Sequence, residues 1–349
     1  MYLDNLEGTQ ILSQQLTDSQ GRPIRYIRVS VTDRCNLRCR YCTPSSDFVS
    51  ILHTQVLSYE EIERIIKVLA PHGVNSVRIT GGEPLVRKHL PRLVQSLSSI
   101  PGVEDLSLTT NGILLGQAAA DLKKSGLSRV NVSIDTLREN RFQWITDPEG
   151  TRKSDDLSSV MAGLKEAWRV GLTPVKINVV LMKGFNDDEL EQFVELTREN
   201  DFEVRFIEFM PMGLNGHWNE DRVMPAAEAI TRLREHYPEW EPLGRGKGSG
   251  PATRYRIPGN IGTIGFITPI SSHFCAQCNR IRLTADGKLR TCLFSDQEID
   301  LIPLLRGSAG DDELFETIRA AIQSKPHGHE ISTKGSAASC ARLMSHIGG

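Results

Sequence analysis

Short runs rich in β-branched and aromatic residues alternate with stretches of helical period through the first two thirds of this 349-residue chain. The β-rich runs cover 26–31, 76–80, 106–109, 129–134, 175–181 and 202–209. The clearest helical stretch begins at Ser58, which can form a capping box with Glu61. Repeated βα units predict a parallel sheet. Because six units are fewer than the eight of a closed barrel, the sequence predicts an α/β fold: a partial, open (β/α)6 barrel of the TIM type.

The pattern changes beyond about residue 215. A helix is expected over 225–236, followed by a Gly-rich basic segment at 244–250 and by antiparallel strands around Tyr255, Gly265 and 280–293. The turn Ala-Asp-Gly-Lys at 285–288 is typical of a hairpin. We therefore divide the chain into a barrel core over 19–240 and a C-terminal extension over 241–349 that can lie across the open barrel.

Six of the seven cysteines form two groups of three. The groups are C-x3-C-x2-C, with Cys35, Cys39 and Cys42, and C-x2-C-x13-C, with Cys275, Cys278 and Cys292. Clustered cysteines at ligand spacing indicate metal rather than disulfides in a chain without a secretory signal. Three thiolates leave one coordination position free for chemistry. The seventh cysteine, Cys340, is expected to be a small, partly buried residue.

The two cysteine groups differ in how specifically their spacing indicates one kind of metal centre. Zinc sites usually pair C-x2-C with a second pair, so the first group favours an iron–sulfur cluster with one open iron. Its spacing also differs from the C-x2-C-x2-C of bacterial ferredoxins. The second group is less specific, and a zinc ribbon that lacks one ligand is an alternative interpretation.

Net charge and hydrophobic composition narrow the kinds of partner that this chain can bind. The formal net charge is only −2, so no global field favours nucleic acid or an acidic membrane. No apolar run approaches the roughly 20 residues of a membrane span, and the first ten residues, MYLDNLEGTQ, do not resemble a signal peptide. We expect a cytoplasmic protein.

Unusual residues recur where the predicted strands end. Gly81-Gly82-Glu83-Pro84 follows the second strand and 109–112 ends the third. The first cysteine group follows the first strand, Ser133 and Asp135 end the fourth, Asn178 lies in the fifth, and Met210 ends the sixth. Because functional residues of βα folds gather at the carboxyl ends of the strands, we expect a single site there. Taken alone, Gly81-Gly82 is better interpreted as a turn.

Two parts of the chain resemble known families. Residues 32–42, Thr-Asp-Arg-Cys-Asn-Leu-Arg-Cys-Arg-Tyr-Cys, resemble the cluster loop of the radical S-adenosylmethionine (radical SAM) superfamily, as does the Gly-Gly-Glu-Pro element. Residues 274–294 and the terminal Gly348-Gly349 are similar to the GTP 3′,8-cyclase family, which opens molybdenum cofactor biosynthesis. The resemblance runs from about Gly21 to the end. Thr43 departs from it, since the family commonly has Met after the third cysteine.

The resemblance implies two [4Fe–4S] clusters, one on each cysteine group, with S-adenosylmethionine bound at the open iron of the first. It implies cofactor contacts from Tyr41, Gly82, Ser133 and Met210. It implies GTP contacts from Arg28, Arg78, Thr109, Lys176, Asn279, Arg280 and Arg282. The chain has no G-x4-G-K-[ST] loop, so triphosphate binding must rest on arginines. The second cluster is expected to bind the guanine edge, with Asn279 close by.

The implied reaction is a radical cyclisation. A 5′-deoxyadenosyl radical abstracts the ribose H3′ of GTP, and the C3′ radical adds to guanine C8, giving (8S)-3′,8-cyclo-7,8-dihydroguanosine 5′-triphosphate. The resemblance assigns catalytic roles to the first cysteine group, Arg280 and Arg282, and to Gly348 and Gly349, whose tail would thread into the arginine-lined site. An electron donor is a further implied partner, and a homodimer is one assembly the sequence allows.

Three alternatives remain at this level. Another radical SAM enzyme with an auxiliary cluster, one that matures a peptide or a cofactor, would keep the first cysteine group without needing paired arginines beside the second. An iron–sulfur electron carrier predicts a smaller chain without the Gly-Gly-Glu-Pro element. A zinc-binding partner module is the third.

Overall fold

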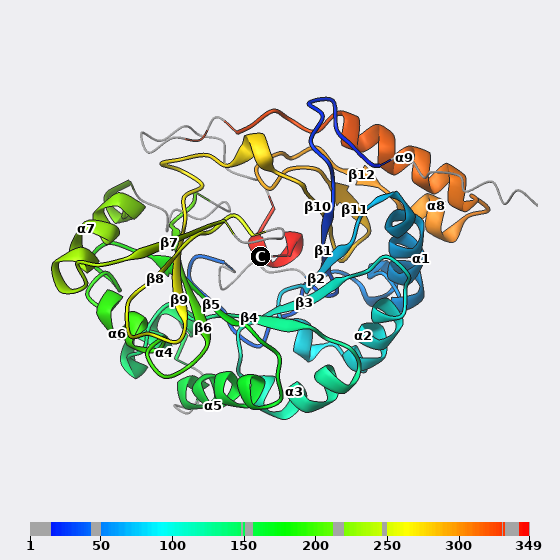
Figure 1. The fold of residues 1–349 in the computed structure, drawn as a ribbon. Coiled ribbons are helices and arrows are strands. Elements are labelled where there is room, and N and C mark those ends of the chain that lie inside the picture. Colours follow the sequence, from blue (N-terminus) through cyan, green and yellow to red (C-terminus); the bar gives the residue numbers. More distant parts are fainter. Residues whose placement is uncertain are drawn as a thin grey trace, which may run out of the picture.

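The computed structural model describes residues 15–42, 50–147, 149–150, 156–211, 220–245, 250–329, 331 and 342–348. Within these residues the chain builds one curved, open sheet of twelve strands with helices on its outer face (Figure 1). Thr43, Cys340 and Gly349 lie outside the described residues.

Six parallel strands form the centre of the sheet, each within about a residue of its predicted bounds. They are β1 (Tyr26–Ser30), β2 (Ser76–Thr80), β3 (Asp105–Thr110), β4 (Arg129–Ser133), β5 (Val175–Leu181) and β6 (Phe202–Glu208). The helices between and after them are α1 (Tyr59–Leu69), α2 (Leu90–Ser98), α3 (Leu115–Lys124), α4 (Glu139–Thr146), α5 (Asp156–Arg169), α6 (Leu190–Glu195) and α7 (Ala226–His236). The partial barrel is therefore confirmed.

Local sequence signals account for several of these boundaries. Ser58 accepts a hydrogen bond from the Glu61 amide at 3.1 Å, and the Glu61 carboxylate accepts one from the Ser58 amide at 2.6 Å. This is the predicted capping box at the start of α1. The apolar face of α1 then packs in the layer between sheet and helices, where Ile62, Ile65 and Ile66 are fully buried.

The C-terminal extension lengthens the sheet at both edges. Strands β9 (Thr263–Ile267), β8 (Thr253–Arg256) and β7 (Glu241–Arg245) continue beyond β6, and β9 is parallel to β6. Strands β10 (Arg280–Leu283), β11 (Lys288–Arg290) and β12 (Ile299–Asp300) continue beyond β1, and β10 is parallel to β1. The predicted hairpin at 285–288 joins β10 to β11.

The expectation that the extension lies across the open barrel is correct only in part. Its strands extend the sheet, because their backbone groups pair with the two exposed edges of the six-stranded centre. The connection from β9 to β10, residues 268–279, crosses from one edge to the other, and it carries Cys275 and Cys278.

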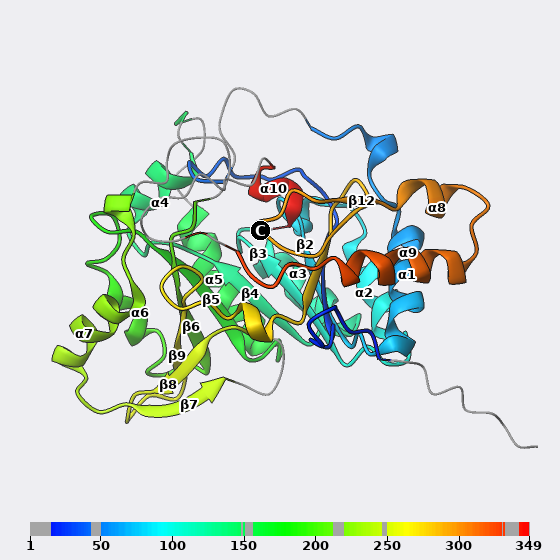
Figure 2. The same cartoon turned by 90° about the horizontal axis from the view of Figure 1, so that it is seen from above.

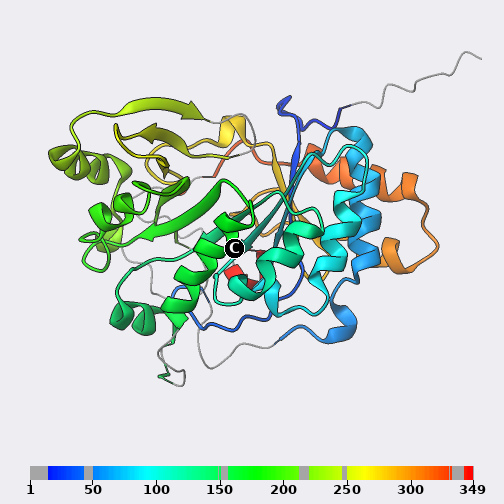
Figure 3. The same ribbon diagram turned by 60° about the horizontal axis from the view of Figure 1, so that its bottom comes forward.

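The end of the chain returns to the inside of the curved sheet. After α8 (Ile302–Arg306) and α9 (Asp311–Gln323), which lies beside α1, the short helix α10 (Met344–Ile347) sits within the curve (Figures 1 and 2). Figure 3 shows the same end enclosed by the strands and helices of the barrel. None of the described helices is long and apolar enough to cross a membrane.

Candidate active site

The two cysteine groups lie at opposite ends of the parallel strands. The first group follows β1 and is at the carboxyl end. The second precedes β10, which runs parallel to β1 with Tyr26 opposite Arg280, and returns at Cys292 after the antiparallel β11. The five residues of β1 span about 16 Å at ~3.3 Å per residue, so a strand length separates the groups.

The first cysteine loop is held by the Gly-Gly-Glu-Pro element. A side-chain carbon on Gly82 would come within 2.5 Å of the carbonyl oxygens of Asp33 and Arg34, so only glycine fits there. The buried Glu83 accepts hydrogen bonds from the Thr110 hydroxyl at 2.8 Å and the Asn111 amide at 2.7 Å. Gly82 is thus required by the packing of the cysteine loop itself.

Side chains around this loop keep its thiols in a dry environment. Burial raises the pKa of Cys35 to about 12 and that of Cys39 well above its usual value, and the neighbouring thiols add to both shifts. The Asn111 amide approaches Cys35 Sγ at 3.8 Å. The partly buried Cys35, Cys39 and Cys42 of one loop fit a metal cluster, because a desolvated thiolate such as that of Cys35 or Cys39 needs a bound metal to offset its desolvation.

Polar residues at neighbouring strand ends are joined to the same loop. The Tyr41 hydroxyl donates to Asp135 at 2.7 Å, and Asp135 also accepts from the Val180 amide at 2.9 Å. Burial raises the pKa of Asp135 to about 6. Ser133 ends β4 beside Asn178. Met210, just after β6, packs against Ile347 of α10, so the structure brings this predicted cofactor contact to the chain terminus.

Three arginines stand in register across the middle of the barrel. Arg28 of β1 pairs with Arg282 of β10 on one side and with Arg78 of β2 on the other. The neighbours of Arg28 along β1, Ile27 and Val29, pack in the core between sheet and helices. Because side chains alternate along a strand, Arg28 and the two arginines in register with it point into the barrel. Burial and mutual repulsion lower the pKa of Arg28 well below its usual value, and burial lowers the pKa of Arg78 and Arg282 to about 10.

A polar cavity of about 640 Å³ lies at the amino ends of the strands. Among its lining residues six are cationic and three are acidic: Arg25, Arg78, Arg129, Lys176, Arg205 and Arg254 against Glu104, Asp105 and Glu203. Arg129 Nη1 and Arg254 Nε are buried and have no hydrogen-bond acceptor among the described residues. Arg129 pairs with Asp105 through its other terminal nitrogen, so each of these two arginines has one buried nitrogen without an acceptor among the described residues. Such N–H groups fit an anionic ligand with many oxygens.

The cavity continues toward the second cysteine group. A smaller cavity of about 140 Å³ shares Gly250 and Asn279 with the large one and is also lined by Cys278 and Arg280. Burial alone would raise the pKa of Cys278, but the charges of Arg280 and Lys325 outweigh it and lower that pKa to about 7. The surroundings of Cys278 are therefore electropositive, which suits both a thiolate ligand and an anion, whereas burial raises the pKa of Cys275.

Most of the residues predicted from the sequence come together, and some were missed. Arg78, Lys176 and Asn279 line the large cavity and Arg280 lines the small one. Thr109 Oγ1 is buried and has no partner among the described residues. The sequence patterns did not single out four further cationic residues of the cavity: Arg25, Arg129, Arg205 and Arg254. A basic residue at or near the start of a strand is compatible with such a site. It is equally typical of a charge exposed to solvent, so the sequence alone could not assign these residues to the cavity.

The C-terminal tail reaches the row of arginines. Arg282 Nη1 donates to the carbonyl oxygens of Gly348 at 2.9 Å and Ile347 at 3.3 Å. Gly348 has φ +73°, and a side-chain carbon there would come within 2.3 Å of Thr80 Oγ1. The contact also includes Ser30, the residue after Val29 in β1.

Comparisons with known proteins agree with this architecture. Residues 29–197 match the model of the radical SAM superfamily, and residues 202–331 match that of the C-terminal region of molybdenum cofactor synthesis proteins. The solved structure of Streptococcus suis SuiB shares the fold with a TM-score of 0.61, at 15% identity, over 95% of this chain and 78% of that one. The fold and the cysteine loop define a radical SAM protein, and such proteins bind S-adenosylmethionine and a [4Fe–4S] cluster.

Two curated relatives narrow the class. The GTP 3′,8-cyclase of Alkaliphilus metalliredigens is 45% identical over 334 residues, covering 96% of this chain and 100% of the relative. The GTP 3′,8-cyclase of Moorella thermoacetica is 46% identical with the same coverage. The chain belongs to the GTP 3′,8-cyclase family.

The tail contact yields a first prediction. Gly348→Ala should undock α10, because the new methyl group clashes with Thr80 and the left-handed backbone of an alanine is strained by about 1–2 kcal/mol. Hydrogen exchange of residues 342–348, followed by mass spectrometry, should speed up at least about tenfold.

Gly259→Ala is the matched control, since Gly259 has φ +88° but no atom within 4 Å of the added carbon. It should leave exchange in the tail unchanged. Equal protection of the tail in Gly348→Ala and the parent protein would show that the terminus is not seated against Thr80.

Proposed function

We propose that this protein is a GTP 3′,8-cyclase that carries out the first step of molybdenum cofactor biosynthesis in the cytoplasm. The observation that carries this proposal is the row of Arg28, Arg78 and Arg282 between two cysteine groups at opposite strand ends. A nucleoside triphosphate can lie between the groups, with its phosphates among the cations at the amino ends of the strands, its base beside the second group and its ribose turned toward the first.

The first cysteine group would hold the cluster that binds S-adenosylmethionine, and the core over 19–240 would surround it. When bound, this pair supplies a 5′-deoxyadenosyl radical after one electron arrives from an external donor. Gly82 keeps the loop closely packed, while Tyr41, Ser133 and Met210 are proposed to orient the cofactor. The hydrogen bond from Tyr41 to Asp135 fixes the ring position at the loop's third cysteine.

The large cavity would bind the triphosphate. Its volume of about 640 Å³ is within the usual range for small-molecule sites. Arg78, Lys176, Arg205 and Arg254 are proposed phosphate ligands, and a triphosphate would supply the acceptor that Arg254 Nε lacks. Arg28, Arg282 and Thr109 lie farther along the barrel, toward the first cysteine group, and are proposed to contact the ribose end.

The second cysteine group would hold a second [4Fe–4S] cluster on the extension over 241–349. Cys278 and Asn279 border the small cavity, which joins the large one, so the guanine edge would lie there. Arg280 and Lys325 stabilise the thiolate of Cys278, the form in which it would bind a cluster. Gly348 and Gly349 would close the other side of the site through Arg282.

The proposed activity can be tested by anaerobic incubation with GTP, S-adenosylmethionine and dithionite. Chromatography with mass detection should find 5′-deoxyadenosine and a cyclised product that has the mass of GTP but separates from it. Cys39→Ala should abolish cleavage of S-adenosylmethionine. Cys278→Ala should retain some cleavage but lose the cyclised product. If the parent protein cleaved the cofactor but left GTP unchanged, the assignment to this reaction would be wrong.

Arg254 provides a test of the phosphate site. Arg254→Ala should weaken GTP binding by about 1.5–3 kcal/mol, the usual contribution of a hydrogen bond to a charged group, or roughly tenfold or more in Kd. Arg256, two residues along β8, is exposed and outside the cavity lining, so Arg256→Ala serves as the control for loss of charge. Calorimetric titration that gave both variants the same affinity would contradict a phosphate contact at Arg254.

Lys176 predicts a pH signature. Burial and the charge of Arg205 lower the pKa of Lys176 to about 7, so the unliganded side chain is mostly neutral at pH 8. A bound triphosphate favours the charged form and raises that pKa, so binding at pH 8 should take up about one proton. At pH 6, where Lys176 is already charged, its share of the uptake should vanish.

Titration calorimetry in buffers of different ionisation enthalpy measures this uptake. Lys176→Arg keeps a permanent charge and corrects for the opposite titration of the phosphate itself. Equal proton uptake at pH 8 in the parent and Lys176→Arg would remove Lys176 from the phosphate site.

A further inference from the structure

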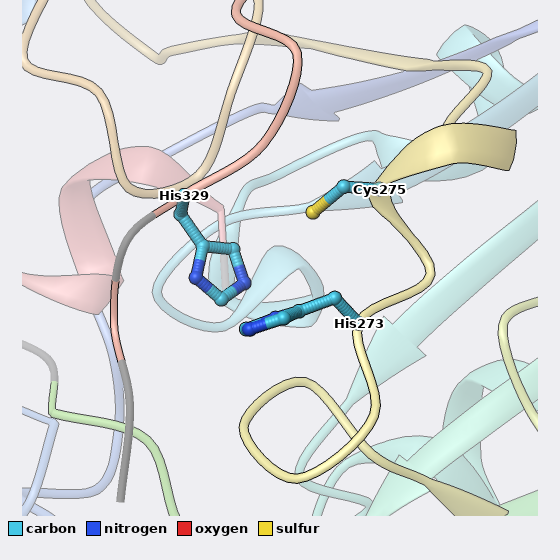
Figure 4. Close-up of side chains that lie close together, drawn as sticks. All are labelled: His273, Cys275 and His329. Carbon is cyan, nitrogen blue, oxygen red and sulfur yellow. The ribbon is translucent and has the colours of Figure 1, made fainter. Parts of the chain in front are cut away.

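Two histidines lie beside Cys275: one precedes the second cysteine group in the sequence and the other follows it. His273 belongs to the connection between β9 and β10, and His329 to the segment after α9. The ligand atoms of His273, Cys275 and His329 all lie within 4.8 Å of one another. Figure 4 shows the thiol and both imidazoles turned toward one space. In the described part of the chain, no other set of His, Cys, Asp or Glu side chains brings three ligand atoms this close.

A buried arginine holds the segments of this cluster together. Arg22 donates hydrogen bonds to the carbonyl oxygens of Cys275 at 2.8 Å, Pro326 at 2.7 Å and His327 at 3.0 Å. Its guanidinium also pairs with the buried Asp18 at 2.6 Å. The loop of Cys275 and the segment before His329 are therefore fixed to each other without help from a metal.

The hydrogen bonding of the His329 ring suits a metal ligand. Its ring makes a hydrogen bond to the backbone of Pro269, which can only accept through its carbonyl oxygen. Its Nδ1 is buried and has no hydrogen-bond partner among the described residues. The donating nitrogen is therefore Nε2, and Nδ1 carries a free lone pair, the usual arrangement of a metal-binding histidine.

One thiolate and two imidazoles make a borderline-soft donor set that zinc prefers. Bonds of about 2.0–2.3 Å to a tetrahedral ion place its ligand atoms roughly 3.3–3.7 Å apart, so the cluster must contract by about 1 Å. His273 is exposed and can rotate to close it. A water molecule would complete the tetrahedron.

We propose that His273, Cys275 and His329 form a mononuclear site for a divalent cation of the zinc class, and that an ion bound there excludes the second iron–sulfur cluster. Both occupants need the thiolate of Cys275. The exclusion rests on the proposed function, because it requires Cys275 to be a cluster ligand, but ion binding by the three residues does not. The second cysteine group then has two alternative metal states, and only the cluster state completes the guanine end of the site.

The ion site can be tested on the full-length chain purified without clusters, with Co²⁺ as the spectroscopic probe. The parent protein should show thiolate-to-cobalt charge transfer and the intense visible bands of a tetrahedral ion, displaced by one equivalent of Zn²⁺. His273→Ala and His329→Ala should each weaken this component at least about tenfold. The exposed His236→Ala, on α7, is the control for loss of a histidine.

A three-cysteine zinc site predicts a different pattern. Cys278→Ser and Cys292→Ser should leave the cobalt component in place, because neither residue belongs to the cluster around Cys275. If these changes removed the component while His273→Ala and His329→Ala did not, the proposed ion site would be wrong. His273 is exposed, so a folding defect would not account for the His273→Ala result.

Exclusion is tested by anaerobic iron loading with and without prior Zn²⁺. Zinc should lower the iron content of the parent protein from about eight to about four per chain, as one cluster is lost. His273→Ala/His329→Ala should reach about eight in both cases. Full iron loading of a zinc-bound parent would refute the exclusion. A parent protein that reached only about four without zinc would instead refute the second cluster of the proposed function and leave the ion site standing.

Discussion

The parallel pairing of β10 with β1 is the interaction on which the rest of this site depends. It joins residues about 250 positions apart and places Arg282 directly opposite Arg28. Because β10 runs in the direction of β1, the cysteines that precede it lie at the amino end of the barrel, away from the first cysteine loop at the carboxyl end. An antiparallel β10 would have put both groups at the same end and left no room for a substrate between them.

The barrel interior concentrates positive charge that the protein alone does not neutralise. Arg28, Arg78 and Arg282 repel one another in the middle of the barrel. The cavity at the amino ends of the strands is lined by more cations than carboxylates. Buried ions without partners cost several kcal/mol, so this excess of cations is destabilising in the unliganded protein and an anion would relieve it. Part of the compensation comes from the chain itself, since the carbonyl oxygen of Gly348 accepts from Arg282. The tail thus uses part of the hydrogen-bonding capacity of the Arg282 guanidinium.

The two cysteine groups differ in their electrostatic surroundings. Burial raises the pKa of Cys35 to about 12, whereas nearby cations lower that of Cys278 to about 7. The first group therefore binds metal in a dry pocket closed by Glu83 and Asn111. In the second group, Cys278 forms a thiolate readily near neutral pH, whereas burial raises the pKa of Cys275. The Cys275 thiol therefore needs a bound metal to offset its desolvation, and a cluster or a competing divalent ion can supply it.

The sequence by itself determined the local features. Six strands, the capping box at Ser58 and the spacing of both cysteine groups follow from short-range patterns, and the family resemblance named Arg28, Arg78 and Arg282. The tertiary structure decided how these parts meet. Whether β10 joins the edge at β1, whether Arg129, Arg205 and Arg254 face one cavity, and whether His329 reaches Cys275 depend on strand register and on contacts such as those of Arg22. Such contacts link residues far apart in the chain, and no local pattern encodes their geometry.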